Sequence, residues 1–157
     1  MAPMSTKRQI AFEIIDVARM LKTYSDQRAR QFGISRAQWA VLVRLERSEG
    51  LKQSELAEML DLQPISLTRL LDRLAESGLI ERRPDPNDRR ANRLYLAPAA
   101  RPLLAKLTDL GHSMMDTVLE SLSDESREHL LRHLGVMRDN LRTAINRNAN
   151  EPQAANA

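Results

Sequence analysis

Several residue types are scarce or missing in this sequence of 157 residues. It contains no cysteine, which excludes disulfides, thiolate metal sites and cysteine-based redox switches. Aromatic residues make up only 3% of the chain, so a core has to be built mainly from leucine and other aliphatic side chains. No stretch approaches the roughly 20 apolar residues that span a bilayer. Residues 1–8 are polar and precede no signal-peptide core, and we therefore expect a cytoplasmic protein.

Charge is abundant but nearly balanced. The 24 Lys and Arg residues exceed the 21 Asp and Glu residues by enough to give a net charge of only +3. A small net charge does not by itself indicate a polyanionic partner, so only the distribution of the charges along the chain can do so. The length favours one domain.

Apolar residues recur at spacings of three and four over most of the chain, which predicts helices. The predicted helices cover residues 5–32, 36–48, 53–60, 64–77, 99–121 and 123–146. Gly33 is expected to end the first helix, and Ser35 and Ser123 are expected to be N-caps. The tail, residues 147–157, lacks periodicity and is predicted to be disordered.

Residues 79–83 and 93–96 instead show the alternation of short β-strands. Residues 84–92 between them are rich in turn formers and predict a rigid loop at the tip of a hairpin. Together with the helices this predicts a mainly α (α+β) fold, a winged helix–turn–helix.

Residues 53–72 have the spacing of a helix–turn–helix, with Asp61 in the turn because aspartate tolerates the left-handed region. The second helix of such a motif presents its N-terminal half to the major groove of DNA. The candidate DNA contacts are Gln63, Ser66, Thr68 and Arg69, then Arg73 one turn further, and Arg36 at the start of an earlier helix. The alternative for this surface is an ordinary solvated helix face.

Five arginines lie between residues 82 and 93, opposed by only two aspartates. Arg89 and Arg90 are the candidate contacts to phosphates or the minor groove. Asp88 is expected to shape the loop by accepting hydrogen bonds from a neighbouring arginine. A charged loop without function is the alternative.

Residues 56–96 resemble the multiple-antibiotic-resistance regulator (MarR) family. The resemblance rests on SLTRLLDRL at 66–74, GLIER at 78–82 and the wing signature DRRANRLYL at 88–96. The helix order extends it to residues 9–146. Where the family commonly has a threonine after the last wing strand, this chain has Ala97 and Pro98, so the cap of the next helix is expected to be weaker or displaced.

The resemblance implies a homodimer with a winged helix–turn–helix at about 35–97 and dimerisation helices at about 5–32 and 99–146. The sequence supplies a separate reason for dimerisation, because three long one-sided helices cannot all be buried against one small winged domain. A two-fold dimer would require a pseudo-palindromic operator in double-stranded DNA.

The resemblance also implies a transcription regulator, most often a repressor released by a small aromatic acid, phenol or coenzyme A ester. The expected cleft lies between the winged lobe and the dimer helices. The candidate effector-binding residues are Arg19, Met20, Tyr24, Trp39, Arg44, His112 and Met115. Plain core packing is the alternative for Trp39, and gap filling for the methionine.

Other chemistry has little support in the sequence. His129 and His133 lie four residues apart on one helix face, but two ligands leave a zinc site incomplete, and we expect no metal or cofactor. No phosphate-binding loop, serine elbow or cysteine nucleophile is present, so we expect no enzyme activity. The remaining alternative is a helical protein-interaction module without DNA specificity.

Overall fold

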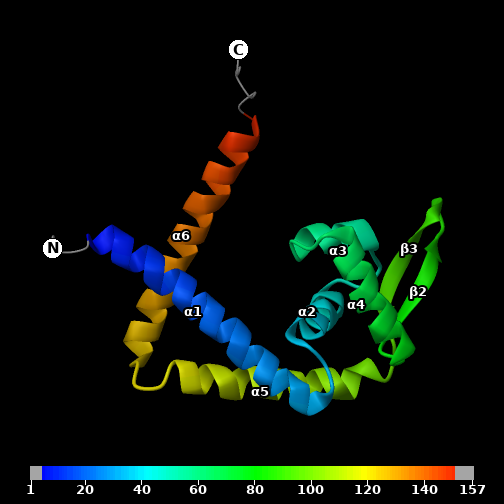
Figure 1. The fold of residues 1–157 in the computed structure, drawn as a ribbon, viewed down its shortest axis with the longest axis horizontal. Helices are drawn as coiled ribbons and strands as arrows, with labels where there is room; N and C mark the ends of the chain where they lie inside the picture. Colours follow the sequence, from blue (N-terminus) through cyan, green and yellow to red (C-terminus); the bar gives the residue numbers. More distant parts are fainter. Residues whose placement is uncertain (1–4, 151–157) are drawn as a thin grey trace. The chain divides into compact units, whose positions relative to one another are not determined.

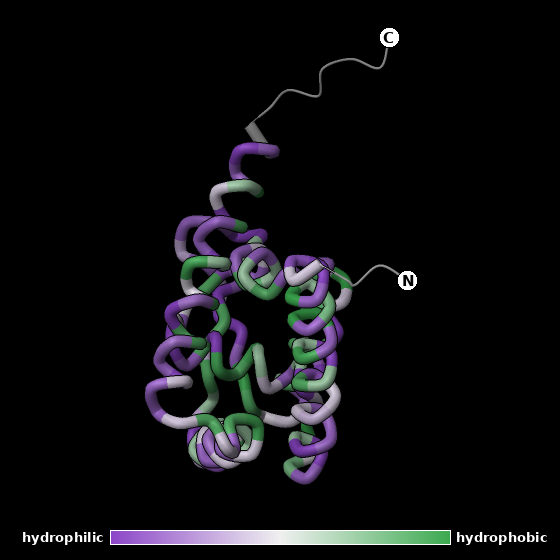
Figure 2. The backbone as a smooth tube through the Cα atoms, turned by 90° about the vertical axis from the view of Figure 1, so that its left-hand side faces the viewer, coloured by the Kyte–Doolittle hydropathy of each residue, from purple (hydrophilic) through white to green (hydrophobic). Residues whose placement is uncertain are grey.

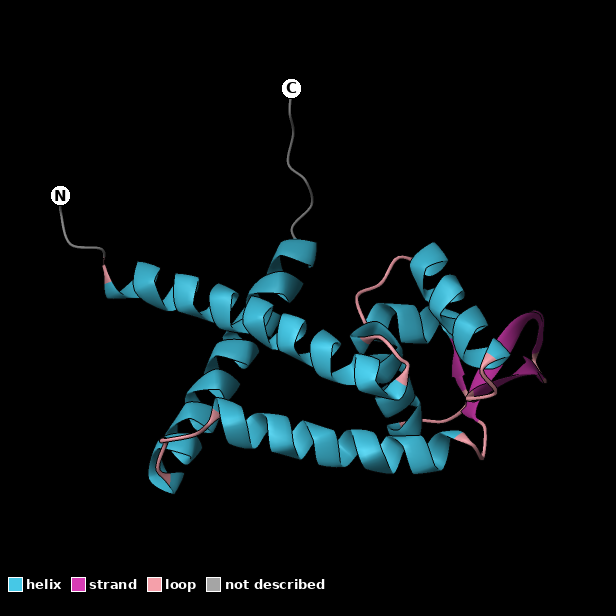
Figure 3. Cartoon of the chain, turned by 60° about the horizontal axis from the view of Figure 1, so that its bottom comes forward, coloured by secondary structure: helices cyan, strands magenta, loops and turns pink. Residues whose placement is uncertain are grey.

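The computed structural model describes residues 5–150 and the side chains of residues 5–148. Residues up to Met114 form one compact unit, and residues from Met115 onward form a second. The elements of the first unit, labelled in Figure 1 where there is room, are α1 (Thr6–Ala29), η1 (Arg30–Phe32), α2 (Arg36–Arg47), β1 (Leu51–Lys52), α3 (Gln53–Met59), α4 (Pro64–Glu76), β2 (Ile80–Asp85), β3 (Asp88–Leu96) and most of α5 (Ala100–Val118). Figure 3 shows the helical character of the chain and its one β-hairpin. No helix among the described residues is long and apolar enough to cross a membrane.

A glycine and a serine mark the end of the first helix and the start of the second. The predicted helix over 5–32 is α-helical only to Ala29 and closes with the 3₁₀ turn η1. Gly33 then adopts the left-handed conformation, with φ 73°, as expected of a glycine at a helix end. Ser35 caps α2 by accepting from the Gln38 N–H, and the Gln38 side chain accepts from the Ser35 N–H in return.

The helix–turn–helix prediction is confirmed in α3 and α4. Asp61 takes the left-handed conformation in the turn, with φ 51°. The Leu62 N–H donates to the Ala57 carbonyl at 2.9 Å and closes the end of α3. Pro64 is the first residue of α4, where its missing N–H leaves no hydrogen bond unmade.

The sheet differs from the prediction in two respects. The strands have the order β1-β3-β2, and β1 was missed because two residues carry no alternation to detect. The predicted loop over 84–92 is wrong: both strands continue into it, and only Pro86 and Asn87 separate them. Pro84 is tolerated in β2 because this strand lies at the edge of the sheet.

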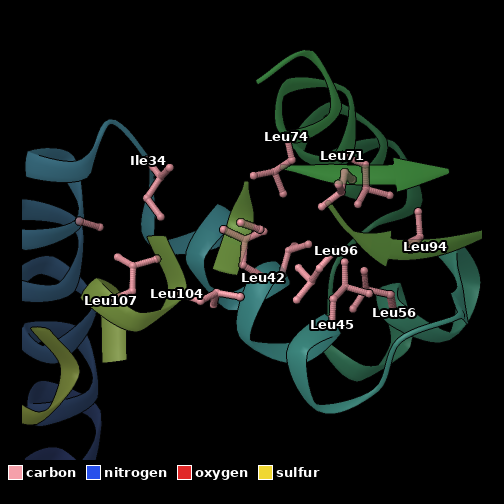
Figure 4. Packing of buried hydrophobic residues seen from close by; sticks show 14 of the residues in the cluster. Ile34, Leu42, Leu45, Leu56, Leu71, Leu74, Leu94, Leu96, Leu104 and Leu107 are labelled. Carbon is pink, nitrogen blue, oxygen red and sulfur yellow. The ribbon is translucent and has the colours of Figure 1, made fainter. Parts of the chain in front are cut away.

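The core of the first unit is aliphatic, as the shortage of aromatic residues requires. Fully buried leucines come from α2 (Leu42, Leu45), α3 (Leu56), α4 (Leu67, Leu71, Leu74), β3 (Leu94) and α5 (Leu104, Leu107). Figure 4 shows the labelled members of this set converging between the helices and the hairpin. This packing fixes which side of α4 faces inward, and therefore which side faces solvent.

The second unit holds the end of α5 and the helix α6 (Asp124–Asn150). Ser123 accepts from the Ser126 N–H, which confirms it as a cap. The helix continues past the predicted boundary at 146, so residues 147–150 are helical rather than disordered, and residues 151–157 lie outside the described part. Hydrophobic and hydrophilic residues alternate along the long helices in Figure 2.

Candidate nucleic-acid interface

The helix α4 has one buried side and one polar exposed side. Leu67, Leu71 and Leu74 are fully buried. Ser66, Arg69 and Arg73, predicted as DNA contacts, are all exposed, as is Gln63 immediately before the helix. A hollow of about 300 Å³ on the surface of α4 is lined by Ser66, Arg69 and Arg73 together with Ala37, Leu62 and Leu70.

Thr68 is the exception among the predicted contacts. Its side chain is half-buried, and its hydroxyl donates to the Pro64 carbonyl at 2.9 Å while accepting from the Gln53 amide at 2.7 Å. These bonds use the hydroxyl proton and one of its lone pairs to join the start of α3 to α4. Gln53 was not predicted, because nothing in the local sequence indicates a bond to a residue 15 positions away.

The hairpin formed by β2 and β3 carries the second set of predicted contacts. Arg89 and Arg90 are exposed on β3, close to the two-residue turn. Asp88 accepts a hydrogen bond from the backbone N–H of Arg90 at 3.0 Å, so it fixes the local backbone rather than an arginine side chain. The expected shaping role of Asp88 therefore acts through the main chain.

The other three arginines of the hairpin have structural partners. Arg82 pairs with Asp72 of α4 at 2.6 Å, which ties the hairpin to the helix. Arg83 pairs with Glu81 at 2.9 Å and lies 4.2 Å from the centre of the Tyr95 ring. Over residues 5–148, Arg89 and Arg90 are the members of the five that form no ion pair, so their charges remain available to a polyanion.

Arg93 belongs to a buried charge cluster at the base of the hairpin. The side chain of Asp85 is fully buried, with Arg93 Nε at 3.0 Å and Lys52 Nζ at 3.6 Å. The hydrogen bond from the Asn87 N–H, together with the two cations, holds the pKa of the Asp85 carboxyl below its usual range. Arg93 also donates to the Gly50 carbonyl at 2.9 Å, so the cluster joins all three strands.

The start of α4 and the hairpin meet at a groove. This groove has a volume of about 340 Å³ and lies between the start of α3, the start of α4 and β3. Its lining includes Gln53, Pro64 and the two cationic residues Lys52 and Arg90. Of the predicted contacts, Arg90 lines this groove, whereas Ser66, Arg69 and Arg73 line the hollow on α4 described above.

Arg36 is placed differently from the other predicted contacts. Its backbone N–H donates to Asp26 at 2.9 Å, and its guanidinium Nε lies 3.9 Å from the same carboxylate. These contacts join the start of α2 to α1, so its part in DNA binding stays a prediction.

The candidate effector residues fall into three groups. Tyr24 and Trp39 are half-buried and pack against the core, and Arg44 is also half-buried. Arg19, which pairs with Asp16 at 3.2 Å, is exposed, as are Met20 and His112. Met115 begins the second unit and is 41% exposed.

His129 and His133, four residues apart on α6, lie next to each other. The ring centres of His129 and His133 are 6.3 Å apart. Among the described residues, no three His, Cys, Asp or Glu side chains gather in a way that could hold a metal ion.

Comparison with known proteins shows which family the helix–turn–helix and hairpin resemble. Residues 34–91 match the model of the MarR family. These residues form a MarR-family domain. The match contains the whole helix–turn–helix and the tip of the hairpin with Arg89 and Arg90.

Solved structures of MarR-family regulators have the same fold over most of the chain. The transcriptional regulator SlyA is 26% identical over 84% of this chain and 93% of its own, with a TM-score of 0.74. A mutant of MepR from S. aureus is 26% identical over 83% and 97%, with a TM-score of 0.69. A MarR transcriptional regulator from Methanosarcina mazei Go1, at 24% identity over 86% and 97% with a TM-score of 0.79, supports the fold alone.

The chain therefore has the fold of MarR-family transcription regulators. In winged helix–turn–helix proteins the second helix of the motif is called the recognition helix and the hairpin is called the wing, and these names are used below for α4 and the β2–β3 hairpin.

Proposed function

We propose that the protein is a homodimeric, sequence-specific regulator that binds double-stranded DNA. One observation carries this proposal: α4 exposes Ser66, Arg69 and Arg73 around one hollow, and its first residue, Pro64, lines a groove together with Arg90 of the wing. A recognition helix in the major groove and a basic hairpin against the flanking phosphates or minor groove would use both parts at once.

The two parts have different roles in this proposal. Arg69, with Ser66 beside it, reads base edges, because a guanidinium can make a bidentate contact to guanine worth about 1–3 kcal/mol of discrimination. Gln63 adds a further polar side chain to this surface, and Thr68 holds α4 to the start of α3 through its hydrogen bond with Gln53. Arg73, Arg89 and Arg90 contact the backbone and carry no sequence information.

Dimerisation completes the proposed site. Large apolar side chains are exposed on α1 and α6, among them Ile15 at 64%, Leu131 at 74% and Ile145 at 64%. A second copy of the chain would cover them and would set two recognition helices about one DNA turn apart on a pseudo-palindromic operator.

We further propose that the protein is a repressor released by a small aromatic acid, phenol or coenzyme A ester. Trp39 is the one tryptophan in the sequence, so its fluorescence is a specific reporter of binding near α2. Titration with a panel of these compounds should change the Trp39 emission and release bound DNA at the same concentrations. If no compound of the panel changes the Trp39 emission or releases bound DNA, the effector proposal is contradicted, while the proposal of DNA binding is unaffected.

DNA binding is tested by fluorescence anisotropy with the duplex upstream of the protein's own gene, at two salt concentrations. Arg69→Ala should remove about 1–3 kcal/mol of preference for the specific duplex over a scrambled one, which is roughly 5- to 150-fold. Arg89→Ala combined with Arg90→Ala should weaken binding to the specific and the scrambled duplex by the same factor. It should also reduce the slope of log affinity against log salt concentration by about one unit for each lost phosphate contact.

Arg132→Ala, which removes the same charge from an exposed position on α6, is the matched control and should change neither quantity. Equal and salt-insensitive binding of both duplexes by the wild type and all variants would instead favour a protein-interaction module.

A further inference from the structure

We propose that Ile65 is a specificity-determining residue that contacts the C5-methyl group of a thymine in the major groove. The inference rests on the proposed function, because it assigns a base to one position of the recognition helix. It adds an apolar contact to a set of predicted contacts that contained only polar and charged side chains.

The position of Ile65 on α4 follows from the buried residues of the same helix. At 3.6 residues per turn, Leu67, Leu71 and Leu74 mark one side of α4, and Ile65 and Arg69 fall roughly opposite to them. Ile65 is 63% exposed, and Leu67, two residues along, is fully buried. Ile65 and Arg69 therefore form the ridge that points most directly away from the core.

The surroundings of Ile65 favour DNA over a protein partner as its occupant. Its neighbours on the exposed surface of α4 are Ser66, Arg69 and Arg73, which suit a polyanion. In the major groove the thymine methyl is the apolar feature that distinguishes base pairs. An aliphatic side chain among polar and cationic ones matches that mixture of groups.

The spacing also limits which thymine is read. Side chains four residues apart on a helix have Cβ atoms about 5–6 Å apart, and successive base pairs lie about 3.4 Å apart. We therefore expect the thymine contacted by Ile65 to lie within about two base pairs of the guanine contacted by Arg69. Each half of a palindromic operator should contain one such pair.

Replacement of thymine by deoxyuridine tests this contact, because it removes the methyl group and preserves the base pair. A duplex is first selected by the wild-type protein from a random library, and each thymine is then replaced in turn. One position in each half-site should weaken wild-type binding about fourfold, the effect of one methyl-sized group at about 0.8 kcal/mol, and both together roughly fifteenfold. Ile65→Ala should be insensitive to replacement at those positions.

Two variants make the experiment specific. Ile65→Val retains part of the contact and should keep a reduced sensitivity to deoxyuridine. Met59→Ala removes a different exposed apolar side chain, 48% exposed at the end of α3, and should retain the full wild-type profile.

Specific, salt-dependent binding by the wild type with no sensitive thymine, or with the same sensitivity in Ile65→Ala, would overturn this inference alone. Failure of the selection to yield any preferred duplex would overturn both the inference and the proposed function.

Discussion

Among the described residues, Asp85 is the one charged residue that is buried. Its side chain is fully buried between Arg93 and Lys52 and accepts the Asn87 N–H. Asp85→Asn keeps an acceptor for this N–H but leaves two cations without their carboxylate, so we expect the Tm to fall by several degrees at a fixed protein concentration. Glu81→Gln, which neutralises an exposed carboxylate on the same strand, should leave the Tm almost unchanged. Circular dichroism melting measures both.

The same carboxylate should make stability depend on pH. Its folded-state pKa is lowered, first by the Asn87 N–H and then by the cations, so its stabilising effect is complete above the unfolded value of about 3.9. That effect is lost as the pH falls through the folded-state pKa. Between about pH 6 and pH 3 the wild type should therefore lose more stability than Asp85→Asn. Parallel stability curves for the two proteins would contradict the assignment.

These residues also show what the sequence does and does not predict. Ser66, Arg69 and Arg73 were placed on an exposed surface because helix periodicity alone orients them. Gln53 and Asp85 were missed because their partners come from other elements. Ile65 was missed for another reason: an isoleucine suggests the core, although the same helix periodicity places it beside Arg69 and its exposed fraction is 63%.

At the scale of elements, the start of α2 depends on one reciprocal pair of hydrogen bonds. The Ser35 hydroxyl accepts the Gln38 N–H at 3.2 Å, and the Gln38 side chain accepts the Ser35 N–H at 2.8 Å. Ser35→Ala should therefore lower the free energy of unfolding by about 1 kcal/mol in urea titrations. Ser35→Asp restores an acceptor and should recover most of the loss. Ser54→Ala, at an exposed position of α3, is the control for removal of a serine hydroxyl.

Helices were easier to predict than strands for a physical reason. The periodicity, Gly33 and Ser35 lie within the segments that they delimit, so the helix bounds came out within a few residues. The two residues of β1 are a strand only because they pair with Leu94 and Arg93, more than forty positions later. The wing strands were predicted too short because Pro84 and the residues around it favour turns locally, whereas pairing across the hairpin holds them extended.

At the scale of the whole molecule, α6 carries an apolar stripe that the second unit by itself does not bury. Leu134, Leu141 and Ile145 fall on one side of the helix and are 46%, 62% and 64% exposed. Periodicity predicts such a stripe, and the structure adds the exposed fraction of each of its side chains. A second copy of the chain is the partner that would cover the same surface on both molecules.

Sedimentation equilibrium tests this assembly. The wild type should have twice the chain mass of 17.9 kDa, and Leu141→Glu combined with Ile145→Glu should be monomeric, because a charge on each side chain opposes its burial. Val136→Glu, at an exposed position on the opposite side of α6, should remain dimeric. The monomeric variant should also lose most of its operator affinity, since one recognition helix then binds without the other. The dimeric arrangement would be contradicted if the wild type sedimented as a monomer and its operator affinity equalled that of the double variant.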